Sequence, residues 1–243
     1  MLQRKIMGPA AALIVVLGIV VVIYSFMERA KAQRVTKAPL IRTGSLATQP
    51  GGSPVSVEGN VACPQPLISP FTGTPCLYYS IKCTAEWKEG ETKKTKELSN
   101  VKTAAQFLID DGSGPAWINA TQGGTFEPTQ IKSETKGAGL LGGITGKELL
   151  FGQYVVSTGA FGIGTKYEVK EEVLPLQPRL YVNGAANGGV ITEPTGLQSL
   201  IISNKTRDHL LASSLKTAKL ALIGGIAAIV VGSVLGVVSR LMA

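Results

Sequence analysis

Two uncharged apolar runs frame the chain, one near each end. Residues 7–27 and 220–239 contain no charged side chain. At a rise of about 1.5 Å per residue, each run is long enough as a helix to cross a hydrocarbon layer about 30 Å thick. Between the two runs, apolar and polar residues alternate over short distances. The pattern therefore predicts an N-terminal transmembrane helix within residues 1–27 and a C-terminal one over residues 220–239, with a separate middle segment.

The first run also fits a cleaved signal peptide. Arg4 and Lys5 resemble the basic start of such a peptide, and Ala30-Lys31-Ala32 resembles a cleavage site. However, the apolar run is longer than the roughly 7–15 residues typical of a signal peptide. Glu28 and Arg29 also crowd the position where cleavage would occur. We therefore favour a membrane anchor.

Small residues recur every four positions along the second run, at Gly224, Ala228, Gly232 and Gly236. At this spacing they share one helix face, and Gly232 to Gly236 forms a G-x-x-x-G pattern. Small residues let two helix backbones approach closely in lipid. The stripe predicts a helix-packing face whose partner is either the first apolar helix or a second copy of the chain, which would make a homo-oligomer.

The middle segment begins with a basic linker over residues 28–54, which ends in the turn-forming residues 49–54. From Val55 onward, apolar and polar residues alternate as they do in β-strands. The longest strand is predicted from Cys76 to Trp87. Alternation places two sets of side chains on its opposite faces, namely Leu77, Tyr79, Ile81 and Cys83 on one, and Cys76 and Tyr78 on the other.

A hairpin is predicted where residues 107–109 and 116–118 flank the turn Asp110–Gly114. It resembles a hairpin that recurs in OB-fold barrels. Further short strands are expected within residues 153–156, 167–169, 180–182, 190–191 and 200–202. Many short strands with turns between them favour a mainly β fold, a small OB-like or half-open β barrel within residues 55–205. Asp208 is predicted to cap a juxtamembrane helix over residues 206–219.

The charge distribution predicts the orientation of the chain. The net charge is +8 although only 16% of residues are charged. Nine basic residues near the apolar runs lie on the side of the middle segment, against three on the side of the two ends. The positive-inside rule therefore places the middle segment in the cytoplasm or its topological equivalent, beside the lipid bilayer.

The sequence gives little support for catalysis or cofactor binding. Three cysteines and one histidine at loose spacing form neither a zinc motif nor a disulfide framework. Gly137-x-Gly139-x-x-Gly142 matches a dinucleotide pattern but lacks the required strand before it and helix after it. Asp110 and Asp111 are interpreted as turn residues. We expect no catalytic residue, no metal and no cofactor.

Nucleic-acid binding by an OB-type groove is a further hypothesis, since aromatic side chains stack on bases. The candidates are Tyr78, Tyr79, Trp87 and Trp117. Aromatic residues make up only 6% of the chain, and no basic run is interleaved with them. Packing in a protein core is therefore the favoured role of these side chains.

Three segments resemble motifs of the GIDE domain. The first is Ser69-Pro70-x-Thr72-Gly73-x-Pro75-Cys76-x-Tyr78-Tyr79. The second runs from Phe107 to Ile118 and includes Asp110 and Gly114. The third joins Glu171-Glu172-Val173-Leu174-Pro175 to Leu180-Tyr181-Val182-x-Gly184. The domain occurs in mitochondrial and chloroplast membrane ubiquitin ligases and in many bacterial and archaeal proteins. The resemblance implies a membrane protein related to ubiquitin ligases.

The chain departs from the eukaryotic ligases, which carry a zinc-binding RING after the second span. No cysteine follows Cys83 here, so ligase activity does not carry over, and we expect a prokaryotic form. Three hypotheses remain open. The chain is a non-catalytic scaffold for an unknown membrane or cytoplasmic protein, a component of a ligase system whose partner supplies the RING, or an OB-type binder of a ligand or nucleic acid.

Overall fold

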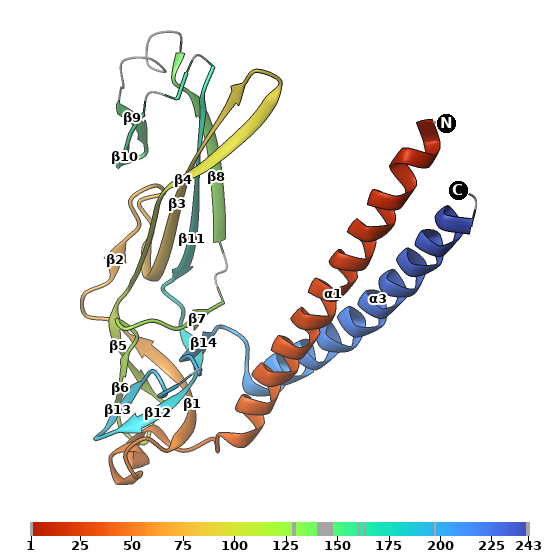
Figure 1. Ribbon diagram of the computed structural model, residues 1–243. Coiled ribbons are helices and arrows are strands. Elements are labelled where there is room, and N and C mark those ends of the chain that lie inside the picture. The colour runs from red at the N-terminus through yellow and green to blue at the C-terminus, as the bar shows by residue number, and fades with distance from the viewer. Residues whose placement is uncertain are drawn as a thin grey trace. The chain divides into compact units, whose positions relative to one another are not determined.

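The computed structural model describes residues 2–127, 130–139, 148–159, 161–162, 164–196 and 198–241. The chain divides into two compact units, each described by itself (Figure 1). The helical unit combines Met1–Pro39 with Lys205–Ala243, and the β unit comprises Leu40–Asn204. The first division therefore falls within the predicted linker.

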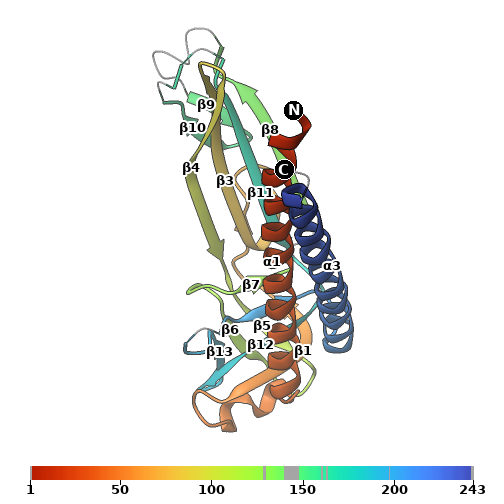
Figure 2. The same ribbon diagram turned by 45° about the vertical axis from the view of Figure 1, so that its right-hand side comes forward.

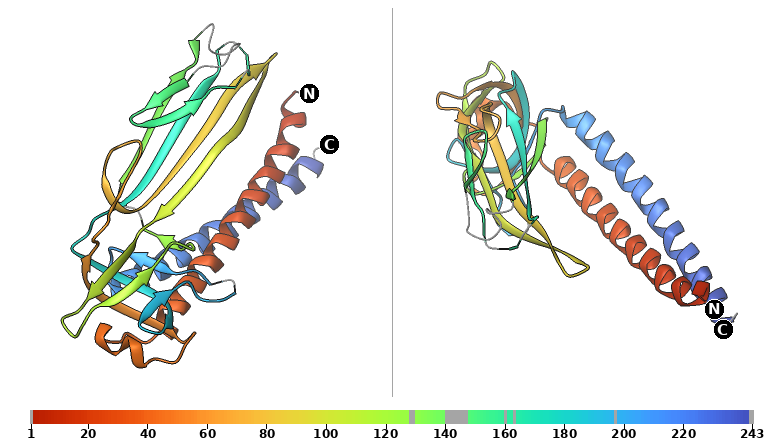
Figure 3. Two further views of the ribbon diagram at one scale, coloured as in Figure 1. Left: turned by 90° about the vertical axis from the view of Figure 1, so that its left-hand side faces the viewer. Right: turned by 90° about the horizontal axis from the view of Figure 1, so that it is seen from above.

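The helical unit is an antiparallel hairpin of two long helices, α1 (Leu2–Lys37) and α3 (Arg207–Leu241) (Figure 3). Both are long and apolar enough to span a membrane. Helix α1 continues past the apolar run into the predicted linker, because residues 28–38 contain good helix formers and no proline, and Pro39 follows them. Helix α3 unites the predicted juxtamembrane helix and the second apolar run. The predicted cap at Asp208 was wrong, because α3 begins at Arg207 and the backbone N–H of His209 donates to Thr206 Oγ1 at 3.4 Å, which places Thr206 at the cap position.

The two helices meet along a seam of small residues spaced seven apart. Gly18 lies against Gly225, where a Cβ atom on either glycine would lie 2.9 Å from the carbonyl oxygen of the other. Likewise, a Cβ atom at Gly232 would lie 3.0 Å from the carbonyl oxygen of Ala11. Ser25 Oγ donates a hydrogen bond to the carbonyl oxygen of Ala218 at 2.7 Å. Close backbone approach and a buried interhelical hydrogen bond therefore join α1 to α3.

This seam differs from the predicted four-residue stripe. Gly232 belongs to it, but Gly224 has no atom within 4 Å of a Cβ position, and Gly225 lies in the seam instead. Ala228 is half-buried, and Gly236 makes only an ordinary contact with Ala11 Cβ at 3.8 Å. The reason is helical geometry. Seven residues nearly complete two turns, whereas each four-residue step advances about 40° around the helix.

The β unit contains a closed five-stranded barrel in which the order of strands is β1–β5–β6–β13–β12, with β12 pairing back to β1. The strands are β1 (Pro54–Ala62), β5 (Gln106–Asp110), β6 (Ala116–Asn119), β12 (Arg179–Asn187) and β13 (Val190–Thr192). All neighbours are antiparallel except β6 and β13. The predicted OB-like barrel and the hairpin β5–β6 are confirmed. Two short strands, β14 (Ile201–Ser203) and β7 (Thr125–Phe126), extend the sheet beyond β12.

The barrel core follows from the alternation in its strands. Val55, Val57, Phe107, Ile118 and Val182 are fully buried in it. The short 3-10 helix η1 (Thr43–Thr48) packs against this core and buries Leu46. This helix lies in the segment that was predicted to be a linker.

A second sheet, not predicted from the sequence, extends from the barrel (Figure 2). Its strands are β2 (Leu67–Ile68), β3 (Pro75–Glu89), β4 (Thr92–Ala104), β8 (Gln130–Gly137) and β11 (Lys166–Pro175). The hairpin of β9 (Glu148–Phe151) and β10 (Tyr154–Ser157) contributes to its core. Strands β2–β4 are inserted after the first barrel strand, and β7–β11 after the third.

Strand β3 passes from one core to the other. Leu77 and Tyr78 are buried in the barrel core, whereas Ile81, Cys83 and the partly buried Tyr79 belong to the second core. The predicted strand and its alternation are present. Leu77 nevertheless packs in a different core from Tyr79 and Ile81, because the strand begins at the barrel and continues into the inserted sheet.

Replacing Gly184 with valine should destabilise the barrel. A Cβ atom there would lie 2.5 Å from Ile191 Cγ2 and 2.7 Å from Leu200 Cδ1, and overpacking of this kind costs about 1–3 kcal/mol or more. Thermal unfolding of the full chain in detergent, followed by tryptophan fluorescence, measures the loss. Gly137→Ala is the matched control, because no atom lies within 4 Å of its Cβ position. Equal melting temperatures for Gly184→Val and the unmodified chain would contradict the prediction.

Candidate functional site

The first motif forms a tight loop between the two cores. The backbone N–H of Ser69 donates to the carbonyl oxygen of Thr74 at 3.0 Å, and that of Gly73 donates to the carbonyl oxygen of Ser69 at 2.9 Å. Gly73 has φ of +68°, in the left-handed region that favours glycine. The backbone N–H of Thr74 donates to Ser69 Oγ at 3.1 Å. Backbone and side chain thus fix the loop conformation.

The carboxylate of Glu171, from the third motif, anchors this loop. It accepts hydrogen bonds from the backbone N–H of Phe71 at 2.8 Å, the backbone N–H of Thr72 at 3.1 Å and Thr72 Oγ1 at 2.6 Å. Glu171 is only 1% exposed, and a buried charge needs such donors to offset the loss of water. The first and third motifs therefore meet in one buried joint.

The loop also contacts the β9–β10 hairpin. The backbone N–H of Gln153 donates to the carbonyl oxygen of Pro70 at 2.9 Å. The rings of Phe71 and Phe151 meet edge to face, with centroids 6.2 Å apart. At its other end, Pro75 begins β3 and pairs with Ile68 of β2. The motif thus joins the second core to the start of the strand that enters it.

The two buried thiols near this joint are poor nucleophiles. Burial raises the pKa of Cys76 to about 11, and the Glu171 carboxylate adds to that shift. Burial also raises the pKa of Cys83 to about 11. Both side chains are fully buried. They remain protonated at neutral pH, and only the thiolate is reactive.

The tyrosine pair of the motif separates, and Tyr78 forms one wall of a pocket. Its ring stacks on Phe126 with centroids 3.9 Å apart and planes 7° from parallel. The pocket has a volume of about 260 Å³, with Lys102 and Thr103 from β4 on one side and residues 120–124 on another. Burial raises the pKa of Tyr78, so its hydroxyl stays neutral. An aromatic wall beside a lysine suits a single inserted side chain.

Asp110 and Asp111 form a turn that holds η1. Asp110 Oδ1 accepts hydrogen bonds from the backbone N–H of Gly112 at 2.7 Å and of Gly114 at 3.3 Å. Asp111 Oδ1 accepts one from Thr43 Oγ1 at 2.7 Å. Hydrogen bonds from Ser113 and Thr43 hold the pKa of Asp111 well below its usual range. The two carboxylates therefore face different partners.

The second motif resembles the GIDE-domain pattern F-x-x-x-D-x-x-G, in which the aspartate follows the phenylalanine by four residues. Starting from Phe107, this position is Asp111 and not Asp110 as the sequence analysis gave it. Its role is the link to Thr43. Gly184, in the third motif, lies in the barrel, where Ile191 and Leu200 leave no room for a side chain. The structural role of these residues is therefore in the barrel. Asp110 and Asp111 hold the β5–β6 turn and η1, and Gly184 allows close packing in the barrel core.

Sequence reasoning missed the role of Glu171. A signal was present in the strand K-Y-E-V-K-E-E-V-L-P, where Tyr167, Val169 and Val173 are buried at alternate positions. Glu171 occupies the same face, so a charged residue stands where alternation requires an apolar one. Such a residue needs buried donors, and the motif loop supplies them.

Within the described part of the chain, no group of three or more His, Cys, Asp or Glu side chains could hold a metal ion. The dinucleotide-like pattern ends at Gly142, which falls outside the described residues. The expectation that no strand precedes the pattern was wrong, since β8 ends at Gly137, but β8 lies at the edge of its sheet rather than inside it.

Comparison with known proteins identifies the family. A model for GIDE, described as "E3 Ubiquitin ligase", matches residues 82–237. The match covers more than half of the chain and includes the second and third motifs, although it begins after Tyr79. No curated protein and no solved structure matches the chain.

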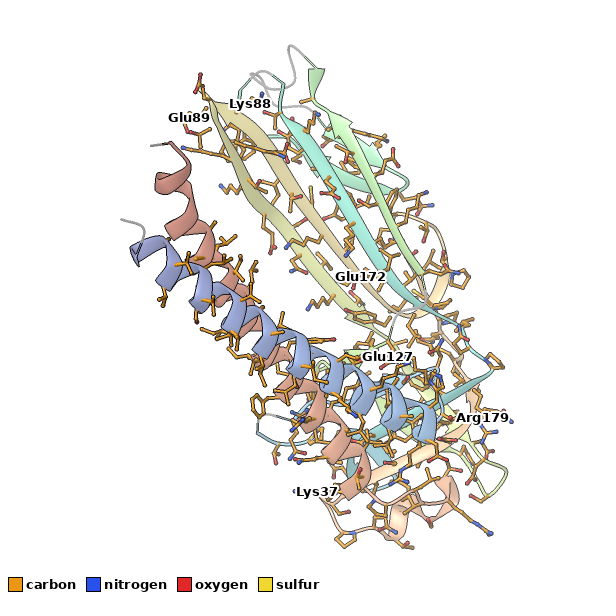
Figure 4. All side chains as sticks on the ribbon, turned by 90° about the vertical axis from the view of Figure 1, so that its right-hand side faces the viewer. Lys37, Lys88, Glu89, Glu127, Glu172 and Arg179 are labelled. Carbon is orange, nitrogen blue, oxygen red and sulfur yellow. The ribbon has the colours of Figure 1, made fainter. Side chains whose placement is uncertain are left out.

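Glu171→Gln should destabilise the β unit by about 2–4 kcal/mol, because an amide cannot accept all three hydrogen bonds of the carboxylate and leaves buried donors without partners. Urea unfolding of the full chain in detergent measures the change. Glu172→Gln is the matched control. Glu172 neighbours Glu171 on β11 (Figure 4) and pairs with Lys170 at 3.0 Å on a partly exposed surface. An equal loss in both variants would contradict the role assigned to the joint.

The three cysteines should differ in alkylation. Cys63 is half-buried, so iodoacetamide at mildly alkaline pH should modify it in the folded chain. Cys76 and Cys83 should react only after denaturation, because they are buried and their pKa values are near 11. Peptide mass spectrometry after timed quenching gives the three rates. Modification of Cys76 at the rate of Cys63 would show that its thiol is accessible.

Proposed function

Since this chain belongs to the GIDE family, we propose that it is a membrane-anchored, non-catalytic interaction module. In this proposal the α1–α3 hairpin crosses the bilayer, and the β unit presents the Tyr78 pocket to a protein partner. The name of the family refers to ubiquitin ligases. That description alone does not assign an activity to this chain.

The proposal rests on one observation: the polar side chains of the motifs are engaged in hydrogen bonds that hold the fold together. Ser69, Thr72 and Glu171 are joined to one another or to the loop backbone by hydrogen bonds. The thiol of Cys76 is buried and protonated at neutral pH. A nucleophile or a general acid needs an accessible group with a suitable pKa. The motifs therefore support the fold, and function falls to exposed surface.

The charge supports a membrane anchor with the β unit beside it. The helical unit contains eleven basic and two acidic residues, whereas the β unit contains thirteen basic and fourteen acidic residues. The basic residues of the helical unit gather mainly on the side where both helices connect to the β unit. The positive-inside rule then places the β unit in the cytoplasm or its equivalent.

A ligase-related role is a second candidate, favoured by the family match alone. Structural zinc sites use four closely spaced Cys or His ligands. The sequence has three cysteines and one histidine, and Cys76 and Cys83 are buried in sheet. Ligase activity would therefore depend on a partner that supplies a RING. Nucleic-acid binding receives less support, because the β unit has no excess of positive charge for phosphates.

A photo-crosslinking experiment tests the interaction module. A benzoylphenylalanine replaces Gln122, an exposed residue of the Tyr78 pocket, in the full chain in its native membrane. The same probe at Lys88, in the β3–β4 hairpin (Figure 4), is the control. We expect one discrete protein adduct from Gln122 and none from Lys88. The further change Thr103→Arg, which fills the pocket, should reduce the adduct at least about tenfold.

Equal adducts at the two positions, or an adduct insensitive to Thr103→Arg, would contradict a role for the pocket. Transfer of ubiquitin by the purified chain without an added RING protein would overturn the non-catalytic assignment.

A further inference from the structure

A groove runs along one side of the α1–α3 hairpin, within the helical unit. Arg29 and Gln33 of α1 line it on one side, and Leu215, Lys219, Leu222 and Ile223 of α3 on the other. Its volume is about 580 Å³. The spacings of four residues on α1 and of four and seven on α3 place these side chains on one face of each helix. The groove is therefore a continuous feature of two adjacent helix faces.

Two cations lie in this groove at the boundary of the apolar runs. Arg29 follows the first run by two residues, and Lys219 immediately precedes the second. Neither takes part in an ion pair or a side-chain hydrogen bond with any described residue. Two positive charges from different helices thus line one groove at the ends of the apolar runs, where lipid headgroups would meet the hydrocarbon layer.

Apart from the Gln33 amide, the rest of the groove is apolar. Leu215 is 54% exposed and Ile223 is 57% exposed, and Leu222 lies between Lys219 and Ile223 in the same lining. An apolar surface that continues from the cations into the membrane-spanning run fits an acyl chain. A free phosphate ion would use only the cations. The combination therefore favours a lipid over a soluble anion.

We propose that this groove binds the headgroup of an anionic phospholipid, an inference that rests on the membrane anchoring proposed above. The Arg29 guanidinium and the Lys219 ammonium donate hydrogen bonds to the phosphate oxygens. The Gln33 amide contacts the polar part of the headgroup. One acyl chain lies along Leu222 and Ile223. Basic pockets between membrane helices recognise anionic lipids through such an arrangement.

A specific lipid site differs from a general attraction of the basic helical unit to anionic membranes. Diffuse attraction to an anionic membrane depends on the number of basic residues and not on their positions. Lipid binding at a specific site depends on Arg29 and Lys219 in particular. Comparing these two residues with other cations on the same helices separates the two cases.

The test measures lipid retention by the full chain. The chain is reconstituted in nanodiscs of phosphatidylcholine with a minor fraction of phosphatidylglycerol, extracted into mild detergent and analysed by native mass spectrometry. Phosphatidylglycerol should be retained in preference to phosphatidylcholine. Arg29→Gln combined with Lys219→Gln should reduce this preference by roughly 25-fold, about fivefold for each charge.

The matched control combines Arg34→Gln with Lys216→Gln, which removes the same charge from the same two helices outside the groove. We expect the control to retain phosphatidylglycerol. An equal loss in both double variants would show diffuse attraction and overturn the site. Release of the lipid by millimolar inorganic phosphate would overturn the choice of a lipid over a soluble anion.

Alkaline extraction of native membranes separates this inference from the proposed function. Release of the chain from the membrane by alkali would contradict the proposed membrane anchor itself. A chain that stays in the membrane but shows no preference for phosphatidylglycerol would overturn the lipid site alone.

Discussion

The buried carboxylate of Glu171 is the interaction on which the β unit depends. A charge removed from water is tolerated only where several donors are aimed at it. Here those donors come from the loop around Phe71 and Thr72. The loop precedes β3, while Glu171 lies on β11, the neighbour of β3. The hydrogen bonds to Glu171 therefore hold the loop and the start of β3 against β11 within the inserted sheet.

Local features of this architecture could be predicted from the sequence, but long-range ones could not. Alternation identifies β3, and the turn Asp110–Gly114 identifies the β5–β6 hairpin, because these signals lie within a few residues of each other. Closure of the barrel depends on β1 pairing with β12, and on the parallel pairing of β6 with β13. Such pairings join distant segments, and a single sequence contains no direct signal of them. The inserted sheet was missed for the same reason.

The helical unit shows a related limit. The glycine stripe of the second run was visible, but a stripe on one helix does not identify the face that meets a partner. The contact requires small residues on both helices in opposite order. Ala11, Gly18 and Ser25 are seven apart, as are Ala218, Gly225 and Gly232, which face them in reverse. Comparing the two runs for a shared seven-residue period would have distinguished Gly225 from Gly224.

The α1–α3 seam and the distribution of charge favour different binding roles for the helical unit and the β unit. The close approach of Gly18 to Gly225 leaves no space for a third helix between α1 and α3, so a further membrane partner has to contact the outer faces of the hairpin. The outer face at Arg29 and Lys219 combines two positive charges that pair with no described residue with an apolar surface, which suits a lipid better than an apolar helix. The nearly neutral β unit lacks such charge. The two proposals accordingly assign protein recognition to the Tyr78 pocket and lipid recognition to the helices.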